Sequence, residues 1–113
     1  MMHNAIAVSF VALGVIACAS VALADPPHIR TGSADSGWSQ ATCLRNVELV
    51  LRSLGFSKDL DVDSNDVEAH NGTYSTETIC SRSGHVLVIV AGPDFERAGV
   101  LRNAIGRGLQ ALQ

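Results

Sequence analysis

Residues 67–91 read VEAHNGTYSTETICSRSGHVLVIVA, and this stretch decides the fold class. The dipeptide Asn71-Gly72 is the strongest short signal for a β-hairpin turn of type I′, and the segments on either side of it have strand character. A second turn at 82–84 leads into a β-branched, apolar run over 85–91. The stretch therefore predicts an antiparallel meander of three strands.

The two faces of this meander follow from the side-chain alternation of strands. Pairing Ala69 with Tyr74, and Cys80 with Val86, places nine residues on one inner face. These residues are Val67, Ala69, Tyr74, Thr76, Thr78, Cys80, Val86, Val88 and Val90. The opposite face is polar on the first two strands and apolar along the third.

The third strand, unlike the first two, is apolar on both faces. Such a strand is not expected at a bare sheet edge. Either the segment Leu60-Asp61-Val62 adds a fourth strand beside it, or another chain covers it. Its outward side chains and one neighbour form a candidate partner surface, which consists of Ile79, Leu87 and Ile89.

Two amphipathic helices flank the predicted meander. Apolar residues recur at spacings of three and four over 39–54, where Ser36 or Ser39 can cap the start and Gly55 can end the helix. A second apolar stripe runs over 94–111. The sequence therefore predicts an α+β domain in the order α-β-β-β-α, with a possible fourth short strand at 60–62 and both helices on one face.

Charge and chain length exclude several classes of protein. The chain has 113 residues, with 8 Lys+Arg against 11 Asp+Glu and a net charge of −3, and no run of basic residues. This pattern lacks the basic patch that binding of nucleic acid or of anionic lipid requires.

Residues 25–37, DPPHIRTGSADSG, are rich in Pro, Gly, Ser and Asp and are expected to form a flexible leader, so that residues 38–113 form a single domain.

The N-terminal segment has the pattern of an export signal. An uncharged stretch runs from Ala5 to Ala24 and has alanine three residues and one residue before Asp25 and two prolines. This pattern predicts a signal peptide over 1–24 that is cleaved after Ala24. A retained transmembrane anchor is one alternative. A second alternative is a lipoprotein, because Val15-Ile16-Ala17-Cys18 resembles a lipobox whose Cys18 becomes lipidated. Apart from these, no membrane association is expected after cleavage.

Two cysteines remain after Cys18 is set aside. An even pair in an exported domain of this size is most simply a disulfide, Cys43–Cys80, which would staple the first helix to the inner face of the sheet. A redox pair normally has C-x-x-C spacing, and Cys43 and Cys80 do not.

An acidic segment is the main candidate for a metal site. Asp59, Asp61, Asp63 and Glu68 resemble a calcium loop, but Ser64 stands where an EF-hand needs glycine and His70 where it needs a bidentate glutamate. The histidines lack the spacings typical of zinc ligands. These four carboxylates are therefore only weak candidates, and no cofactor is expected.

No nucleophile elbow, phosphate-binding loop, dinucleotide fingerprint or zinc-protease motif occurs, so the sequence does not indicate an enzyme. The expected function is that of a small exported module that binds a protein partner, or a second copy as a homodimer, through Ile79, Leu87 and Ile89. The alternatives are binding of a small ligand, calcium or zinc, and anchoring as an envelope lipoprotein. The layout resembles small envelope proteins of Gram-negative bacteria, which implies a periplasmic or secreted location.

Overall fold

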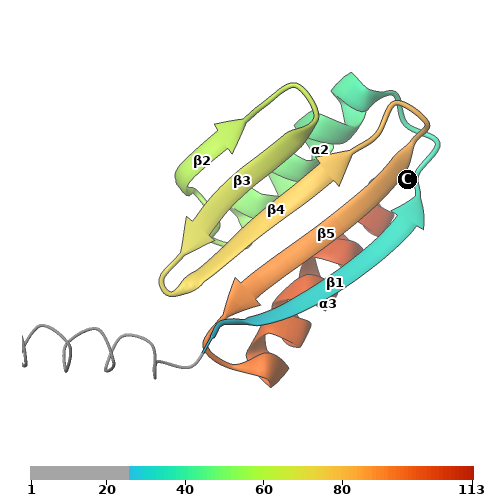
Figure 1. The fold of residues 1–113 in the computed structure, drawn as a ribbon. Helices are drawn as coiled ribbons and strands as arrows, with labels where there is room; N and C mark the ends of the chain where they lie inside the picture. Colours follow the sequence, from blue (N-terminus) through green and yellow to red (C-terminus); the bar gives the residue numbers. More distant parts are fainter. Residues whose placement is uncertain (1–25) are drawn as a thin grey trace, which may run out of the picture.

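The computed structural model describes residues 26–113, which form five strands and two helices (Figure 1). The predicted signal peptide and Cys18 lie outside the described residues. In chain order the elements are β1 (His28–Asp35), α2 (Gln40–Ser53), β2 (Lys58–Val62), β3 (Asp66–Asn71), β4 (Tyr74–Cys80), β5 (His85–Gly92) and α3 (Phe95–Ala111).

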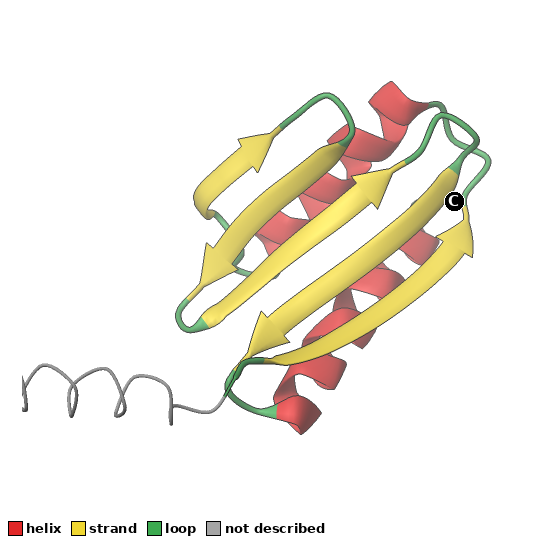
Figure 2. Cartoon of the chain, viewed as in Figure 1, coloured by secondary structure: helices red, strands yellow, loops and turns green. Residues whose placement is uncertain are grey.

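The elements form two layers. The strands make one antiparallel sheet in the order β1-β5-β4-β3-β2, and both helices lie on the same side of it (Figure 2). The α+β class is confirmed, as is the packing of both helices on one face. The sheet has five strands, however, where the sequence predicts three or four. The other sheet face, here called the outer face, carries no helix.

The additional strand is β1, which forms from the segment expected to be a flexible leader. That prediction is wrong for residues 28–35, which pair with β5 from His28 opposite Gly92 to Asp35 opposite His85. The segment has no apolar period because β1 is held mainly by backbone pairing and by α3. Arg102 donates a hydrogen bond to the Thr31 carbonyl at 3.1 Å. β1 therefore covers β5, so that the doubly apolar strand is not an edge.

The short strand expected at 60–62 exists within β2 but lies elsewhere in the sheet. It pairs with β3 at the opposite edge, with Val62 opposite Val67 and Asp61 opposite Glu68. A β-bulge interrupts this pairing between Lys58 and Asp61. The expectation that this segment covers β5 is therefore wrong.

The β3–β4 turn is centred one residue later than expected. Asn71 pairs with Tyr74, so Gly72 and Thr73 form the turn. Gly72 has φ 61°, while Thr73 is not among the residues with positive φ. This combination is typical of a type II′ turn, which has Gly at its first central position, and not of type I′. Ala69 is thus opposite Thr76, a shift of two residues that leaves every side chain on its predicted face.

The core lies between the sheet and the helices. The inner-face residues predicted from the alternation are buried or packed against this core, together with Val47, Leu51, Phe56 and Ile105 from the helices and the loop after α2. The Cys43–Cys80 disulfide joins α2 to β4, the central strand, with an S–S distance of 2.02 Å. A disulfide is compatible with an oxidising, extracellular compartment.

Both helices begin at capping side chains. Ser39 accepts a hydrogen bond from the Thr42 backbone N–H at 3.2 Å, and Asp94 accepts one from the Arg97 N–H at 2.9 Å. The predicted helix boundaries are therefore confirmed to within a residue or two. Neither helix is long and apolar enough to cross a membrane, which is a finding for residues 26–113.

Two threonine hydroxyls in the core provide a first stability test. The Oγ1 atoms of Thr76 and Thr78 are buried and have no hydrogen-bond partner within the described chain. Replacing a buried, unpaired hydroxyl by a methyl group removes its desolvation cost. We predict that Thr78→Val raises the free energy of unfolding by about 1 kcal/mol in urea denaturation. Thr31→Val, an exposed change on β1, should alter it by less than about 0.5 kcal/mol.

The glycines of α3 provide a second test. A Cβ added at Gly106 would meet no atom within 4 Å, whereas one added at Gly108 would lie 2.7 Å from Val50 Cγ1 on α2. Because alanine favours helix, Gly106→Ala should raise the free energy of unfolding by about 1 kcal/mol. Gly108→Ala should lower it by about 1 to 3 kcal/mol, because the stiff Val50 side chain must move. Equal effects of the two substitutions in thermal and urea unfolding would refute this account of the α2–α3 contact.

Candidate binding face of the sheet

Strand register arranges the outer face in rows that cross all five strands. One row runs from Asp61 through Glu68, Glu77 and Ile89 to Thr31. Residues directly opposite one another in a sheet lie on the same face, so each row is a line of neighbouring side chains. The row changes from acidic on β2, β3 and β4 to apolar and neutral on β5 and β1. The outer face is thus divided into an acidic half and an apolar half.

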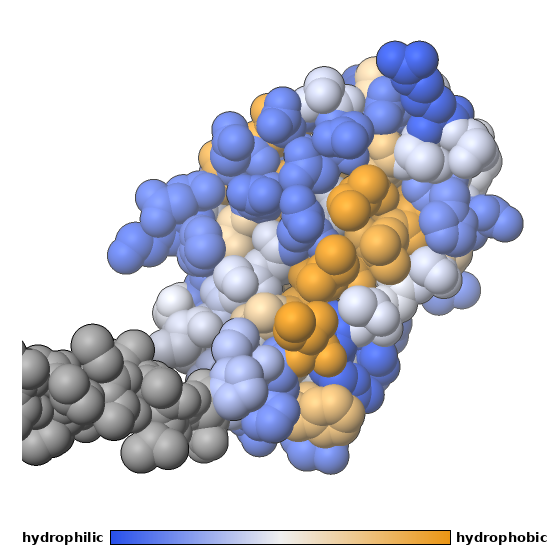
Figure 3. Space-filling view, in the orientation of Figure 1, coloured by the Kyte–Doolittle hydropathy of each residue, from blue (hydrophilic) through white to orange (hydrophobic). Residues whose placement is uncertain are grey.

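The three residues predicted as a partner surface lie together on this face. Ile79 is directly opposite Leu87, and Ile89 follows Leu87 on the same face of β5. All three side chains are half-buried by their neighbours and remain open to solvent. We refer to Ile79, Leu87 and Ile89 as the apolar stripe. In the space-filling view, a hydrophobic band follows the course of β5, and hydrophilic side chains flank it (Figure 3).

The apolar stripe extends onto the strand that the sequence did not reveal. Ile29 of β1 is opposite Ala91 of β5, and its side chain is 58% exposed. Thr31 and Ser33 of β1 lie beside Ile89 and Leu87 and carry no charge. The border of the stripe on the β1 side is therefore neutral, whereas its border on the β3 side is acidic.

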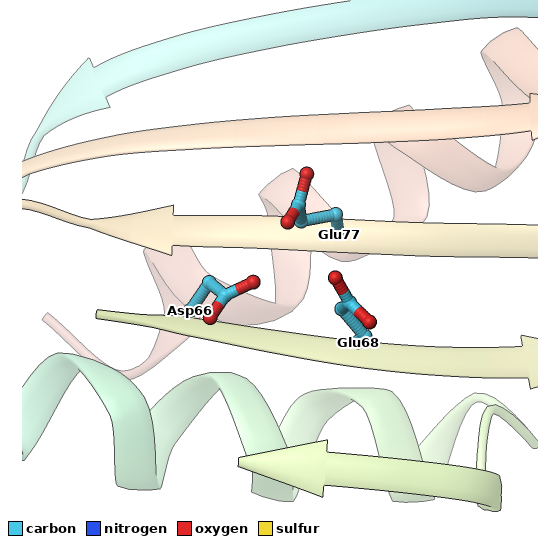
Figure 4. Close-up of side chains that lie close together, drawn as sticks. All are labelled: Asp66, Glu68 and Glu77. Carbon is cyan, nitrogen blue, oxygen red and sulfur yellow. The ribbon is translucent and has the colours of Figure 1, made fainter. Parts of the chain in front are cut away.

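Three carboxylates form an acidic cluster beside the stripe, here defined as Asp66, Glu68 and Glu77 (Figure 4). One carboxylate oxygen from each lies within 4.8 Å of the others. Glu68 and Glu77 are cross-strand partners, and Asp66 is opposite Ile79, so the cluster adjoins the stripe. In the expected register Glu68 faces Ser75. The two-residue shift of the hairpin brings it opposite Glu77, which is why the sequence pattern did not reveal the cluster.

Crowding of negative charge alters the ionisation of the cluster. A hydrogen bond to the Asp66 carboxylate, burial, a hydrogen bond to Glu68 and repulsion by both neighbours raise the pKa of Glu77 from 4.5 to about 7. A protonated Glu77 donates to its neighbours, whereas an ionised Glu77 repels them. The face therefore gains negative charge as the pH rises through neutrality.

The carboxylates predicted as weak metal candidates do not form one site. Of the four, only Glu68 belongs to the acidic cluster, although Asp61 lies opposite it on β2. Asp59 has φ 51° at the bulge of β2, and Asp63 accepts a hydrogen bond from the Ser64 N–H at 2.8 Å in the following turn. The bulge and the turn prevent the convergence that an EF-hand loop would provide.

The acidic cluster has the oxygen donors that calcium prefers. Its three carboxylates project from two adjacent strands, β3 and β4, on the sheet face that carries no helix. A cation held there would therefore have water for most of its ligands. Two histidines lie near strand ends and apart from each other: His85 contacts Asp35, with 2.9 Å between Nδ1 and Oδ1, and His70 is next to the last residue of β3.

Neither a protein-family model nor a curated protein matches this sequence. Among solved structures, the NMR structure of PA4090 from Pseudomonas aeruginosa is similar, with a TM-score of 0.58. The similarity covers 75% of this chain and 83% of that chain, at 18% sequence identity. At this identity the similarity shows the fold alone, and it supports the α+β architecture of a five-stranded antiparallel sheet with two helices.

Proposed function

We propose that this protein is a small, non-enzymatic binding module of the periplasm or of secreted material, whose outer sheet face binds a basic, amphipathic segment of a partner protein. The observation that carries the proposal is the apolar stripe bordered on one side by the acidic cluster. The predicted export signal and the Cys43–Cys80 disulfide support the location.

The apolar half of the face accounts for the affinity in this proposal. Ile79, Leu87 and Ile89 are contiguous, and no element of residues 26–113 covers them. Contiguous exposed apolar patches with polar borders mark interaction sites more often than scattered apolar residues do. Fully burying an exposed side chain of this kind contributes about 1.5 to 3 kcal/mol, so each of these half-buried side chains would contribute roughly half of that. The stripe follows one strand, a shape that suits the apolar ridge of one helix or strand.

The acidic half of the face accounts for the choice of a basic partner. No lysine or arginine of residues 26–113 forms an ion pair with Asp66, Glu68 or Glu77. The hydrogen bond to Asp66 and burial are the main causes of the raised pKa of Glu77, and repulsion by the charges of Asp66 and Glu68 adds to them. A lysine or arginine placed beside the stripe would relieve this repulsion. A second copy of the same face brings Lys58, which pairs with His70, but it also brings its own carboxylates, namely Asp61, Asp66, Glu68 and Glu77. Charge complementarity therefore favours a basic partner over self-association.

The first test uses a helical peptide with a leucine face and lysine flanks, and a matched peptide with glutamate flanks. We expect the lysine peptide to bind in calorimetry and the glutamate peptide not to bind. Leu87→Thr and Ile89→Thr each place a β-branched residue, which suits a strand, at the substituted position, and each should weaken binding about tenfold from the lost apolar burial. The control is Val100→Thr, which changes an exposed apolar residue of α3 and should leave binding unchanged.

Three outcomes would contradict this proposal. Equal binding of the two peptides would show that the acidic cluster does not select a basic partner. Unchanged binding by Leu87→Thr and Ile89→Thr would show that the apolar stripe does not contact the peptide. A dimer in sedimentation experiments that these two substitutions dissociate would assign the face to a second copy of the chain.

The pH dependence provides an independent prediction. Ionisation of Glu77 with a pKa of about 7 should strengthen binding of the lysine peptide as the pH rises through neutrality, and Glu77→Gln should remove this dependence. In the free protein the effect on stability has the opposite direction. The folded state holds the Glu77 proton more tightly than the unfolded state, so the free energy of unfolding should fall as the pH rises from about 4.5 to about 7.

Urea denaturation across this pH range checks the second half of the prediction. Glu77→Gln should flatten the fall in stability, whereas Glu96→Gln, at an exposed position in the first turn of α3, should not. A wild-type stability that rises over the same range would show that Glu77 does not carry the raised pKa.

A further inference from the structure

A groove lies on the helix side of the sheet, opposite the apolar stripe. It runs between β1 and the C-terminal half of α3 and has a volume of about 470 Å³. This volume is within the range of sites that bind small organic molecules. None of Ile79, Leu87 and Ile89 lines the groove, so it is a separate candidate site.

Small residues on both walls leave this space open. Gly32 and Ala34 line the groove from β1, and Gly106 lines it from α3. A Cβ at Gly106 would meet no atom within 4 Å, in contrast to Gly108 of the same helix, which packs against α2. The groove therefore stays open beside Gly106, whereas α3 packs closely on α2 at Gly108.

The floor of the groove is apolar. It consists of Val86 and Val88 of β5, with Leu109 of α3 and Trp38 beside them. The first three side chains are each less than a tenth exposed. Trp38 is the single tryptophan of the chain, so its fluorescence reports on this site alone.

The rim of the groove is cationic. Arg102 and Arg107 line it, and none of its lining residues is Asp or Glu. Arg102 donates one hydrogen bond to the Thr31 carbonyl and two to Asn103 Oδ1, at 2.8 to 3.1 Å. These neutral acceptors hold the guanidinium in place and use three of its five N–H groups, which leaves two for a ligand. In a chain of net charge −3, this is a local positive site.

We propose that this groove binds a small organic anion with an apolar body, such as an alkyl or aromatic carboxylate. The apolar body lies on Val86, Val88 and Leu109, and the carboxylate accepts hydrogen bonds from the free N–H groups of Arg102 with Arg107 nearby. Guanidinium groups are suited to carboxylates because their N–H donors match the two carboxylate oxygens. The amide side chains on the rim, including Asn103 and Gln110, provide further neutral donors.

The test is a titration with decanoate, below its micelle concentration, followed by Trp38 fluorescence and by calorimetry. The uncharged and cationic counterparts are decanol and decylammonium. We expect a saturable response to decanoate that is at least about tenfold stronger than the response to either counterpart, in line with the strength of charged hydrogen bonds. Arg102→Gln and Arg107→Gln should each weaken decanoate binding about tenfold.

Two further variants separate binding from folding. Arg97→Gln removes the same charge from an exposed position of α3 outside the groove, and it should leave binding unchanged. Gly106→Leu fills the groove, so it should abolish binding without lowering the melting temperature. The proposal is overturned if wild-type protein gives no saturable response, if decanol binds as well as decanoate, or if Arg97→Gln weakens binding as much as Arg102→Gln.

Discussion

The pairing of β1 with β5 is the interaction on which the rest of this structure depends. It gives β5, which is apolar on both faces, a hydrogen-bonded neighbour on each side. On the outer face it adds Ile29 and a neutral border to the apolar stripe. On the inner face it provides the glycine and alanine wall of the groove, and it positions the Thr31 carbonyl that holds Arg102. Both proposed sites therefore lose one wall or border without β1.

Two helices cannot cover both faces of a five-stranded sheet, and the distribution of charge follows from this. The helices bury the inner face, whose alternating valines and alanine meet the apolar sides of α2 and α3. The outer face remains in water, where carboxylates on β2, β3 and β4 keep half of it hydrated. The arginines of α3 lie on the opposite layer, so that one small domain presents an acidic surface and a cationic groove on different sides.

Alternation and turn residues predicted the central part of the fold. Both helices and the two faces of β3 to β5 follow from local patterns, because each depends on side chains only a few residues apart. The Cys43–Cys80 pair, with a sequence separation of 37, follows instead from the even number of cysteines left in an exported domain. The strand β1 has no such pattern. Arg30 and Gly32 face α3, where a guanidinium over the Phe95 ring, at 4.1 Å, replaces apolar packing. A polar edge strand held by a distant partner cannot be distinguished from a loop by periodicity.

The three candidate sites differ in how far a local sequence pattern could predict them. The apolar stripe could be predicted because Leu87 and Ile89 lie two residues apart on one strand. The acidic cluster forms only in the observed β3–β4 register, in which Glu68 is opposite Glu77. The turn expected from the sequence lies one residue earlier and would place Glu68 opposite Ser75. The groove depends on the distance between α3 and β1, which no local pattern contains.

The register of β1 also has a consequence for how the chain folds. His28 pairs with Gly92 although most of the domain sequence lies between them, whereas β3, β4 and β5 are joined by short turns. Closing a long loop costs more entropy than closing a short one, so we expect the β3–β4–β5 meander to form before β1 joins it. During that interval β5 is an open edge that can pair with a strand of another molecule. By pairing with β5, the polar strand β1 removes this apolar edge and so protects the protein against aggregation.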